Sequence, residues 1–226
     1  STLYDLKDDD SVKAIVLDIN SPGGSPVASE EISKAIEDVK KVKPVYALIN
    51  DVGASGAYWV ASSADKIYSS SMSTIGSIGV TSAGLSFEDF ILEHNITYRK
   101  LTAGKYKDIG SFYRKQTDEE KAIIQNLLNE IHKNFIKHVA DNRNMSIENV
   151  TKLATGEIFL GSETIKNGLS DKIGYYPDVI SDLKNLTSSE KAIVVTYGST
   201  PTLLQIIGIE SLLDFKPSTK SQILLE

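Results

Sequence analysis

Ser55 lies in a run of small residues that suits a nucleophile at the junction of a strand and a helix. Residues 45–49 before it are apolar and strand-like, and residues 57–61 after it could form a helix packed on a sheet. The first N–H groups of such a helix are unpaired, and their partial positive charge favours negative charge nearby. Gly53 and Gly56 let a substrate approach the backbone closely. A tightly packed helix also needs small residues, so this run alone does not establish catalysis.

The turn Ser21-Pro22-Gly23-Gly24 joins a predicted buried strand over residues 12–19 to a predicted helix over residues 27–42. Paired glycines expose N–H groups with no side chain in the way, as the stabilisation of a tetrahedral oxyanion requires. Two other interpretations stay open. The turn could be a plain strand-to-helix connection with a proline-restricted start, or it could polarise a thioester carbonyl without any serine.

The histidines are poor candidates for the base that a serine nucleophile needs. His132 and His138 fall in an amphipathic helix predicted over residues 117–143, which starts with a capping-box pattern. We expect His138 to be partly buried beside the core, and His94 lies in a polar stretch. No neighbouring residues have the spacing of a catalytic triad, whose members are recognised by geometry in any case.

The lysines of the segment 104–108 are the remaining bases, and Lys105 and Lys107 compete for that role. A lysine accepts a proton only when it is neutral, and the ordinary lysine pKa is about 10.4. Lowering the pKa to near 7 or 8 requires about 3 to 5 kcal/mol of bias against the charged form, at about 1.4 kcal/mol per pKa unit. Burial in an apolar cleft can supply that bias, whereas a solvated loop lysine lacks it.

Four motifs in order resemble the signal peptide peptidase A family: INSPGG at residues 19–24, ASGAY at 54–58, IGSIGV at 75–80 and GKYK at 104–107. The resemblance runs from about Leu6 to Tyr176. These proteins are membrane-anchored serine proteases of the Clp protease and crotonase fold. The resemblance therefore implies an α/β fold with repeated β-β-α and βαβ units, a mostly parallel sheet and a helix-rich second half.

The same resemblance implies a role for each matching residue. Ser55 takes the place of the nucleophile, Lys107 that of the general base, and Ser77 that of the serine that hydrogen-bonds the lysine amine. The backbone N–H groups of Gly24 and Gly56 would form the oxyanion hole. A serine protease of this kind needs no metal and no cofactor.

The chain departs from the family pattern at two aspartates. Asp18 precedes the first motif where an arginine is common, and Asp108 follows Lys107 where small residues are frequent. A nearby carboxylate favours the charged ammonium form of a lysine. We therefore expect Asp108 to point away from the site.

The strand and helix signals alternate along the first half of the chain, which implies a mostly parallel sheet. Strands are predicted at residues 12–19, 45–50, 66–69, 76–81, 96–100 and 192–197. Helices are predicted at residues 27–42, after Ser55, and at 86–94, 117–143, 146–154, 162–167 and 178–186. Residues 3–10 resemble the end of the first helix of the family's catalytic domain.

The composition is that of a globular domain, because hydrophobic residues make up 41% and charged residues 24% of 226 residues. A net charge of −6 argues against nucleic acid as a partner. The absence of cysteine from the sequence excludes disulfides and a thiol nucleophile. We expect a catalytic domain over residues 1–198 and a tail over 199–226 that packs on the protein or enters a cleft.

No apolar stretch reaches the eighteen or more residues of a membrane span, so this sequence is expected to be a soluble fragment. The resemblance implies a membrane anchor and a first strand that the sequence lacks, an extracytoplasmic location, and a ring or dome of protomers. It also implies unfolded, apolar peptide substrates such as remnant signal peptides. A stomatin-type Ser-Lys protease, a crotonase-like acyl-CoA enzyme and a non-catalytic scaffold remain as alternatives.

Overall fold

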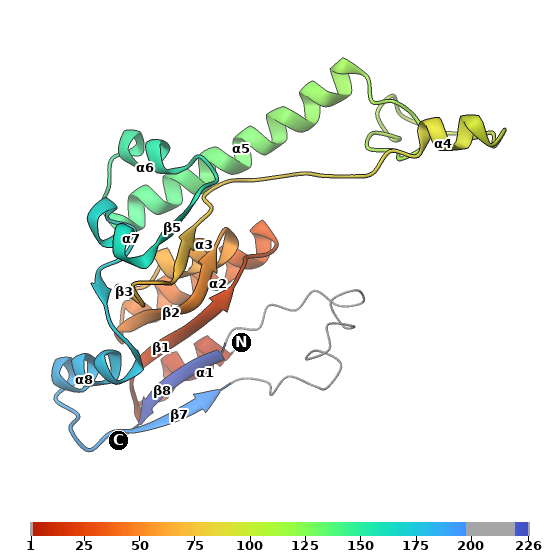
Figure 1. Ribbon diagram of the computed structural model, residues 1–226. Helices are drawn as coiled ribbons and strands as arrows, with labels where there is room; N and C mark the ends of the chain where they lie inside the picture. The colour runs from red at the N-terminus through yellow and green to blue at the C-terminus, as the bar shows by residue number, and fades with distance from the viewer. Residues whose placement is uncertain (1, 198–219, 226) are drawn as a thin grey trace. The chain divides into compact units, whose positions relative to one another are not determined.

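The computed structural model describes residues 2–197 and the backbone of residues 220–225 (Figure 1). The chain divides into two compact units, each described by itself. The first unit comprises Ser1–Gly79 and Phe135–Glu226, and the second comprises Val80–Asn134. No helix in the described part of the chain combines the length and apolar composition of a membrane-spanning helix.

The first unit is built on a mixed, mostly parallel sheet with the strand order β5-β4-β2-β1-β8-β7. Strand β3 pairs with the first half of β2 and β4 with its second half, so the sheet branches there, and β6 extends it beside β3. The strands are β1 (Val12–Ser21), β2 (Val45–Ala54), β3 (Lys66–Ser69), β4 (Thr74–Gly76), β5 (Ile158–Leu160), β6 (Lys172–Ile173), β7 (Ile193–Tyr197) and β8 (Lys220–Leu225).

The helices follow the capping rules at several ends. Pro26 occupies a first-turn position, Ser146 accepts a hydrogen bond from the Asn149 N–H, and Gly168 ends its helix in the left-handed conformation. The helices are α1 (Thr2–Asp8), α2 (Pro26–Lys40), α3 (Gly56–Ser62), α4 (Glu88–Glu93), α5 (Asp118–Arg143), α6 (Ile147–Leu153), α7 (Gly161–Asn167) and α8 (Tyr176–Thr187).

Strand β1 is buried on both faces, and its alternating side chains enter two cores. Ile15, Leu17 and Ile19 belong to the larger core, whereas Ala14 and Val16 belong to a smaller core against α8. A strand covered on both faces reads as a nearly continuous apolar run, which is why this segment is recognisable in the sequence.

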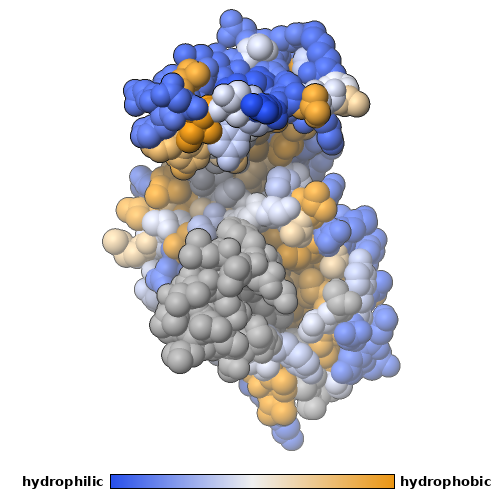
Figure 2. Space-filling model, turned by 90° about the vertical axis from the view of Figure 1, so that its right-hand side faces the viewer, coloured by the Kyte–Doolittle hydropathy of each residue, from blue (hydrophilic) through white to orange (hydrophobic). Residues whose placement is uncertain are grey.

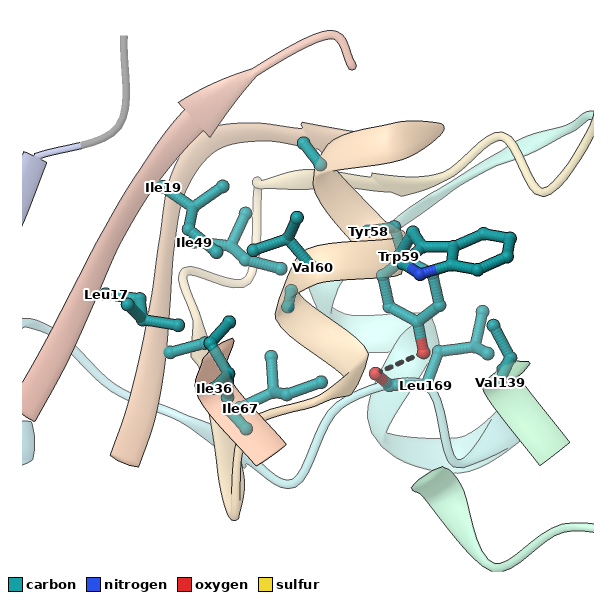
Figure 3. Close-up of a cluster of buried hydrophobic side chains, with 14 of the residues drawn as sticks. Leu17, Ile19, Ile36, Ile49, Tyr58, Trp59, Val60, Ile67, Val139 and Leu169 are labelled. Atoms are coloured by element: carbon teal, nitrogen blue, oxygen red, sulfur yellow. Dashed lines mark hydrogen bonds between the residues drawn. The ribbon is translucent and has the colours of Figure 1, made fainter. Parts of the chain in front are cut away.

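The larger core packs α2 and α3 on one face of the sheet. Figure 3 shows Leu17 and Ile49 of neighbouring strands meeting Ile36 of α2 and Val60 of α3. Each such side chain contributes about 1.5 to 3 kcal/mol when fully buried. This packing holds the beginning of α3, and therefore residue 55, against the ends of the strands.

A buried hydrogen bond ties α3 to the second half of the chain. The Tyr58 hydroxyl donates to the Leu169 carbonyl over 2.8 Å, drawn as a dashed line in Figure 3. Tyr58 is fully buried, so an unpaired hydroxyl there would cost about 1 to 3 kcal/mol.

The second unit contains α4, the first part of α5 and an irregular connection between them. The Phe87 N–H donates to the Phe112 carbonyl, which joins the start of α4 to the later part of this connection. The predicted capping box at the start of α5 is confirmed, because the Glu120 N–H donates to the Thr117 hydroxyl and the Thr117 N–H donates to the Glu120 carboxylate.

Two strand predictions are wrong in the middle of the chain. Strand β4 ends at Gly76, where the prediction began, because Ser77 has a φ of 48° that an extended strand does not accept. Residues 96–100 form no strand, because no strand among the described residues pairs with them, and the Tyr98 and Lys100 side chains contact Asp108. The predicted strand over residues 66–69 is confirmed.

Most of the predicted tail, residues 199–219 and 226, lies outside the described residues. Residues 220–225 form β8, which lies antiparallel between β1 and β7. This segment is extended, as considered for a cleft-binding peptide, but it pairs within the sheet of the first unit.

Candidate active site

Ser55 occupies a sharp turn between the end of β2 and the start of α3. Its backbone angles are φ 52° and ψ −127°, a conformation that residues other than glycine rarely adopt. Such strain costs about 1 to 3 kcal/mol and persists only where the surrounding structure enforces it. Here the Ser55 N–H donates to the Gly76 carbonyl over 2.8 Å, and the Trp59 N–H donates to the Ser55 carbonyl over 3.0 Å. A partly exposed serine on a strained strand-to-helix turn suits a nucleophile.

The glycine turn after β1 lies directly against Ser55. A Cβ atom added to Gly23, which has a φ of 111°, would lie 2.8 Å from the Gly56 nitrogen and 2.8 Å from the Ser55 Cβ. The Ser21 hydroxyl accepts a hydrogen bond from the Gly23 N–H and shapes the turn. Only a residue without a side chain fits such a close approach.

Gly24 and Gly56 also come together at this point. A Cβ atom added to Gly56 would lie 3.1 Å from the Gly24 nitrogen. Among the described residues, neither of the two N–H groups donates a hydrogen bond. Two unpaired donors beside a serine hydroxyl are what an oxyanion hole consists of.

Ser77 leaves the sheet beside Ser55. Ala54 and Gly76 are paired in the parallel register of β2 and β4, so the two serines follow neighbouring strands at the same level. The Ser77 N–H donates to the Glu157 carbonyl over 2.7 Å, which fixes the turn. The glycine turn, Ser55 and Ser77 thus all follow the carboxyl ends of adjacent parallel strands, where α/β proteins bind their ligands.

Lys107 belongs to the second unit, in the connection between α4 and α5. It is exposed, and its N–H donates to the Gly104 carbonyl over 3.2 Å. Within the described residues its amine makes no hydrogen bond and no ion pair. Its amine is therefore not engaged by a carboxylate within the described residues.

Lys105, the competing lysine, is engaged by a carboxylate. Its amine donates to both Glu119 oxygens, over 2.9 and 2.8 Å, and Glu119 also accepts from the Tyr106 hydroxyl. The hydrogen bond to Glu119 holds the pKa of Lys105 above its usual value. A lysine held in its charged form cannot accept a proton, so this geometry favours Lys107 as the base.

The Asp108 carboxylate is also engaged within the second unit. It accepts from Arg114 Nε over 2.5 Å and from the Tyr98 hydroxyl over 2.7 Å, and its distance to the Lys100 amine is 3.0 Å. The hydrogen bond from Arg114 is the main cause that keeps the Asp108 pKa well below its usual range. Sequence reasoning missed Arg114, because it lies in an irregular connection that carries no periodic pattern.

The histidines have structural partners. His138 is partly buried, as predicted, and its ring stacks on Trp59 with 4.4 Å between ring centroids. Its Nε2 lies 3.1 Å from the hydroxyl of the fully buried Ser63 and 3.0 Å from the Trp59 carbonyl. His94 contacts the Phe90 carbonyl through Nδ1. Neither environment contains an accessible nucleophile.

Comparison with known proteins adds independent information. The sequence profile described as peptidase family S49 matches residues 37–190, a span that contains Ser55, Ser77 and Lys107.

No group of His, Asp and Glu side chains that could hold a metal ion occurs in the described part of the chain.

Three curated relatives illustrate the similarity. A protein of Methanocaldococcus jannaschii whose name assigns it as a protease is 40% identical over 87% of this chain and 63% of its own. A protein of Enterococcus faecium named as a signal peptide peptidase SppA is 34% identical over 88% of this chain and 58% of its own. Protease 4 of Haemophilus influenzae is 33% identical over 81% of this chain and 30% of its own. The chain thus spans less than two thirds of the length of these relatives.

Proposed function

The chain belongs to peptidase family S49, a family of serine proteases, and we propose that it cleaves unfolded peptides with a Ser55-Lys107 dyad. The observation that carries this proposal is the strained turn at Ser55 with the unpaired N–H groups of Gly24 and Gly56 beside it. We further propose that residues 1–198 form a catalytic domain of the Clp protease and crotonase fold. Membership of a protease family gives no support to the acyl-CoA enzyme interpretation.

In the first step, the Lys107 amine accepts the Ser55 hydroxyl proton while Ser55 Oγ attacks the carbonyl carbon of the peptide. The carbonyl π electrons move to oxygen, and the resulting oxyanion accepts hydrogen bonds from the N–H groups of Gly24 and Gly56. Each such donor typically accounts for a factor of about 10² to 10³ in rate. Ser77 hydrogen-bonds the lysine amine in this scheme and orients it.

The tetrahedral intermediate then collapses. The Lys107 ammonium gives its proton to the leaving nitrogen as the C–N bond breaks, which leaves an acyl ester on Ser55. A water molecule next loses a proton to the neutral amine and attacks the ester carbonyl. Ser55 regains its proton from the lysine, and the carboxylic acid product leaves.

The partners of the two lysines support Lys107 over Lys105. A general base must be neutral when it acts, and Lys105 is tied to the Glu119 carboxylate by two hydrogen bonds. The Lys107 amine has no carboxylate partner within the described residues. Desolvation by a bound apolar peptide would then favour its neutral form.

Remnant signal peptides and other unfolded, apolar chains are the substrates we propose. The relative from Enterococcus faecium is named as a signal peptide peptidase, which favours this class. By resemblance to the family, we also propose an extracytoplasmic catalytic domain that is held at a membrane by a segment outside this sequence. No cofactor takes part in the scheme.

We propose in addition that several copies assemble into a ring or dome. Figure 2 shows apolar residues, in orange, at the surface among hydrophilic ones in blue. Exposed apolar side chains are frequent in the second unit, and a further copy of the chain is the partner we propose for them. They include Leu85, Phe87, Phe90, Leu92, Ile96, Leu101 and Phe112.

Peptide cleavage by matched variants tests the proposal. A mixed library of unfolded, signal-like peptides is incubated with the parent protein, Ser55→Ala, Lys107→Ala and Lys105→Ala, and products are read by mass spectrometry. We expect cleavage by the parent and by Lys105→Ala, and none by the other two variants. Cleavage that survives in Lys107→Ala but is lost in Lys105→Ala would contradict the assignment of the base.

A further inference from the structure

Lys107 is flanked by two charged residues that are both tied to the first turn of α5. Lys105 donates to Glu119, and Asp108 accepts from Arg114, which in turn contacts Glu120. The backbone on either side of the proposed base is therefore fastened to one helix end.

Arg114 is the centre of this arrangement. Its Nε donates to the Asp108 carboxylate, and one terminal nitrogen donates to the Asp108 carbonyl over 2.7 Å. The two terminal nitrogens also donate to the two Glu120 oxygens, over 2.8 and 2.7 Å. The Asp108 and Glu120 side chains are 10% and 6% exposed and Arg114 is 24% exposed, so these charge-assisted bonds are partly buried.

The charges of this cluster balance. Two carboxylates, of Asp108 and Glu120, face two cations, of Arg114 and Lys100. The Tyr98 hydroxyl gives Asp108 a further hydrogen bond.

The neighbouring charges of the second unit are paired separately. Lys105 balances Glu119, and Lys115 lies within 4.0 Å of Glu88 and Asp89 on α4. The Asp108 carboxylate is thus occupied by cations other than the lysine that adjoins it in sequence.

We propose that Arg114 is a positioning residue of this protease: by binding Asp108 it keeps that carboxylate from pairing with Lys107, which leaves the base free to lose its proton. This inference rests on the proposed Ser55-Lys107 dyad. An unoccupied Asp108 carboxylate next to Lys107 would favour the ammonium form, which is inactive as a base. The hydrogen bond from Arg114 lowers the pKa of Asp108, in agreement with a carboxylate that is fully engaged.

The test is the pH dependence of kcat/KM for peptide cleavage in a set of matched variants. The set comprises the parent, Arg114→Ala, Asp108→Asn and the double variant Arg114→Ala with Asp108→Asn, and Lys107→Ala reports on the dyad itself. Lys100→Gln, which removes the second cation with less damage to packing, covers the case in which Arg114→Ala does not fold. Thermal unfolding and oligomer size are measured for each variant.

The inference predicts a distinctive pattern. Arg114→Ala should shift the acid limb of the profile upward by about one pH unit, which is roughly a tenfold loss on that limb, with kcat affected more than KM. The acid limb of the double variant should lie at the parental pH. The acid limb of Lys100→Gln should shift in the same direction as that of Arg114→Ala, by a smaller amount.

Two results would overturn the inference while leaving the dyad intact. One is an acid limb of Arg114→Ala at the parental pH, even if kcat/KM falls by the same factor at every pH. The other is a double variant whose acid limb stays shifted like that of Arg114→Ala. A Lys107→Ala variant with parental activity would instead refute the proposed function, and the inference would fail with it.

Discussion

The chemistry proposed for this chain depends on single residues in backbone conformations that few residue types adopt. Ser55 and Ser77 both have positive φ angles, and the glycine turn after β1 lies in contact with the first of them. A Cβ atom at Gly23 would lie 2.8 Å from the Gly56 nitrogen. The distance between the two proposed oxyanion donors, the N–H groups of Gly24 and Gly56, therefore depends on the absence of a side chain at residue 23. Local backbone geometry therefore decides whether the two proposed oxyanion donors can act together.

Gly23→Ala tests this dependence. The added Cβ would meet the Gly56 nitrogen and the Ser55 Cβ at 2.8 Å, so we expect peptidase activity to fall at least about tenfold. Gly156→Ala is the matched control, because Gly156 also has a positive φ, 88°, but an added Cβ there meets nothing within 4 Å. Both variants should lose about 1 kcal/mol of stability from strain at a positive φ, Gly23→Ala should lose more because its Cβ meets backbone atoms, and only Gly23→Ala should lose activity. Equal activities in the two variants would contradict this account.

His138 gives a prediction about the pH dependence of stability. Burial lowers the pKa of its imidazole, so the unfolded chain binds the proton more readily than the folded one. The contribution of His138 to the free energy of unfolding should therefore be fully present above the unfolded-state pKa of about 6.5, and it should be lost as the pH drops below that value. Urea unfolding at pH 5.0 and 7.5 measures the difference, and His138→Phe should reduce it. An unchanged difference in His138→Phe would refute the assignment.

At the scale of elements, the sequence predicted what its local patterns determine. The strand over residues 66–69, the buried run of β1 and the capping box of α5 all follow from short-range apolar or capping signals. Strands β5 and β6 escaped prediction because three-residue and two-residue strands carry no usable alternation and form only against a partner. Residues 96–100 look like a strand, but no strand among the described residues pairs with them.

Strand β8 gives a prediction at this scale. It lies between β1 and β7 and pairs with both. A chain shortened after residue 219 therefore leaves one edge of β1 open and β7 without its partner strand. We expect the amides of β7 to exchange with solvent at least about tenfold faster in the shortened chain, as measured by hydrogen–deuterium exchange. Equal protection of β7 in the two chains would show that β8 does not hold it.

At the scale of the whole molecule, the division into two units limits what sequence reasoning could reach. Three of the four motifs lie at the carboxyl ends of β1, β2 and β4, because their residues follow those strands directly. The charge pairs of the second unit could not be predicted, because they join residues 98, 100, 108 and 114 through an irregular connection without a periodic pattern.

The exposed apolar side chains of the second unit lead to a prediction about assembly. Leu101 is fully exposed and apolar, and we expect Leu101→Asp to reduce the size of the particle measured by light scattering on a sizing column. Lys121→Asp is a control at an exposed position of α5 that carries no apolar side chain. A particle of parental size in Leu101→Asp would argue against this surface as the contact between copies.

If Ser55 is a nucleophile activated by Lys107, its oxygen should attack the phosphorus of a fluorophosphonate, expel fluoride and become phosphonylated. The parent, Ser55→Ala, Lys107→Ala and Lys105→Ala are treated with a fluorophosphonate, and the modified residue and its labelling rate are determined by mass spectrometry. We predict labelling of Ser55 in the parent and in Lys105→Ala, and a loss of at least about a hundredfold in rate in Lys107→Ala. Labelling of a different serine, or an unchanged rate in Lys107→Ala, would contradict the claim.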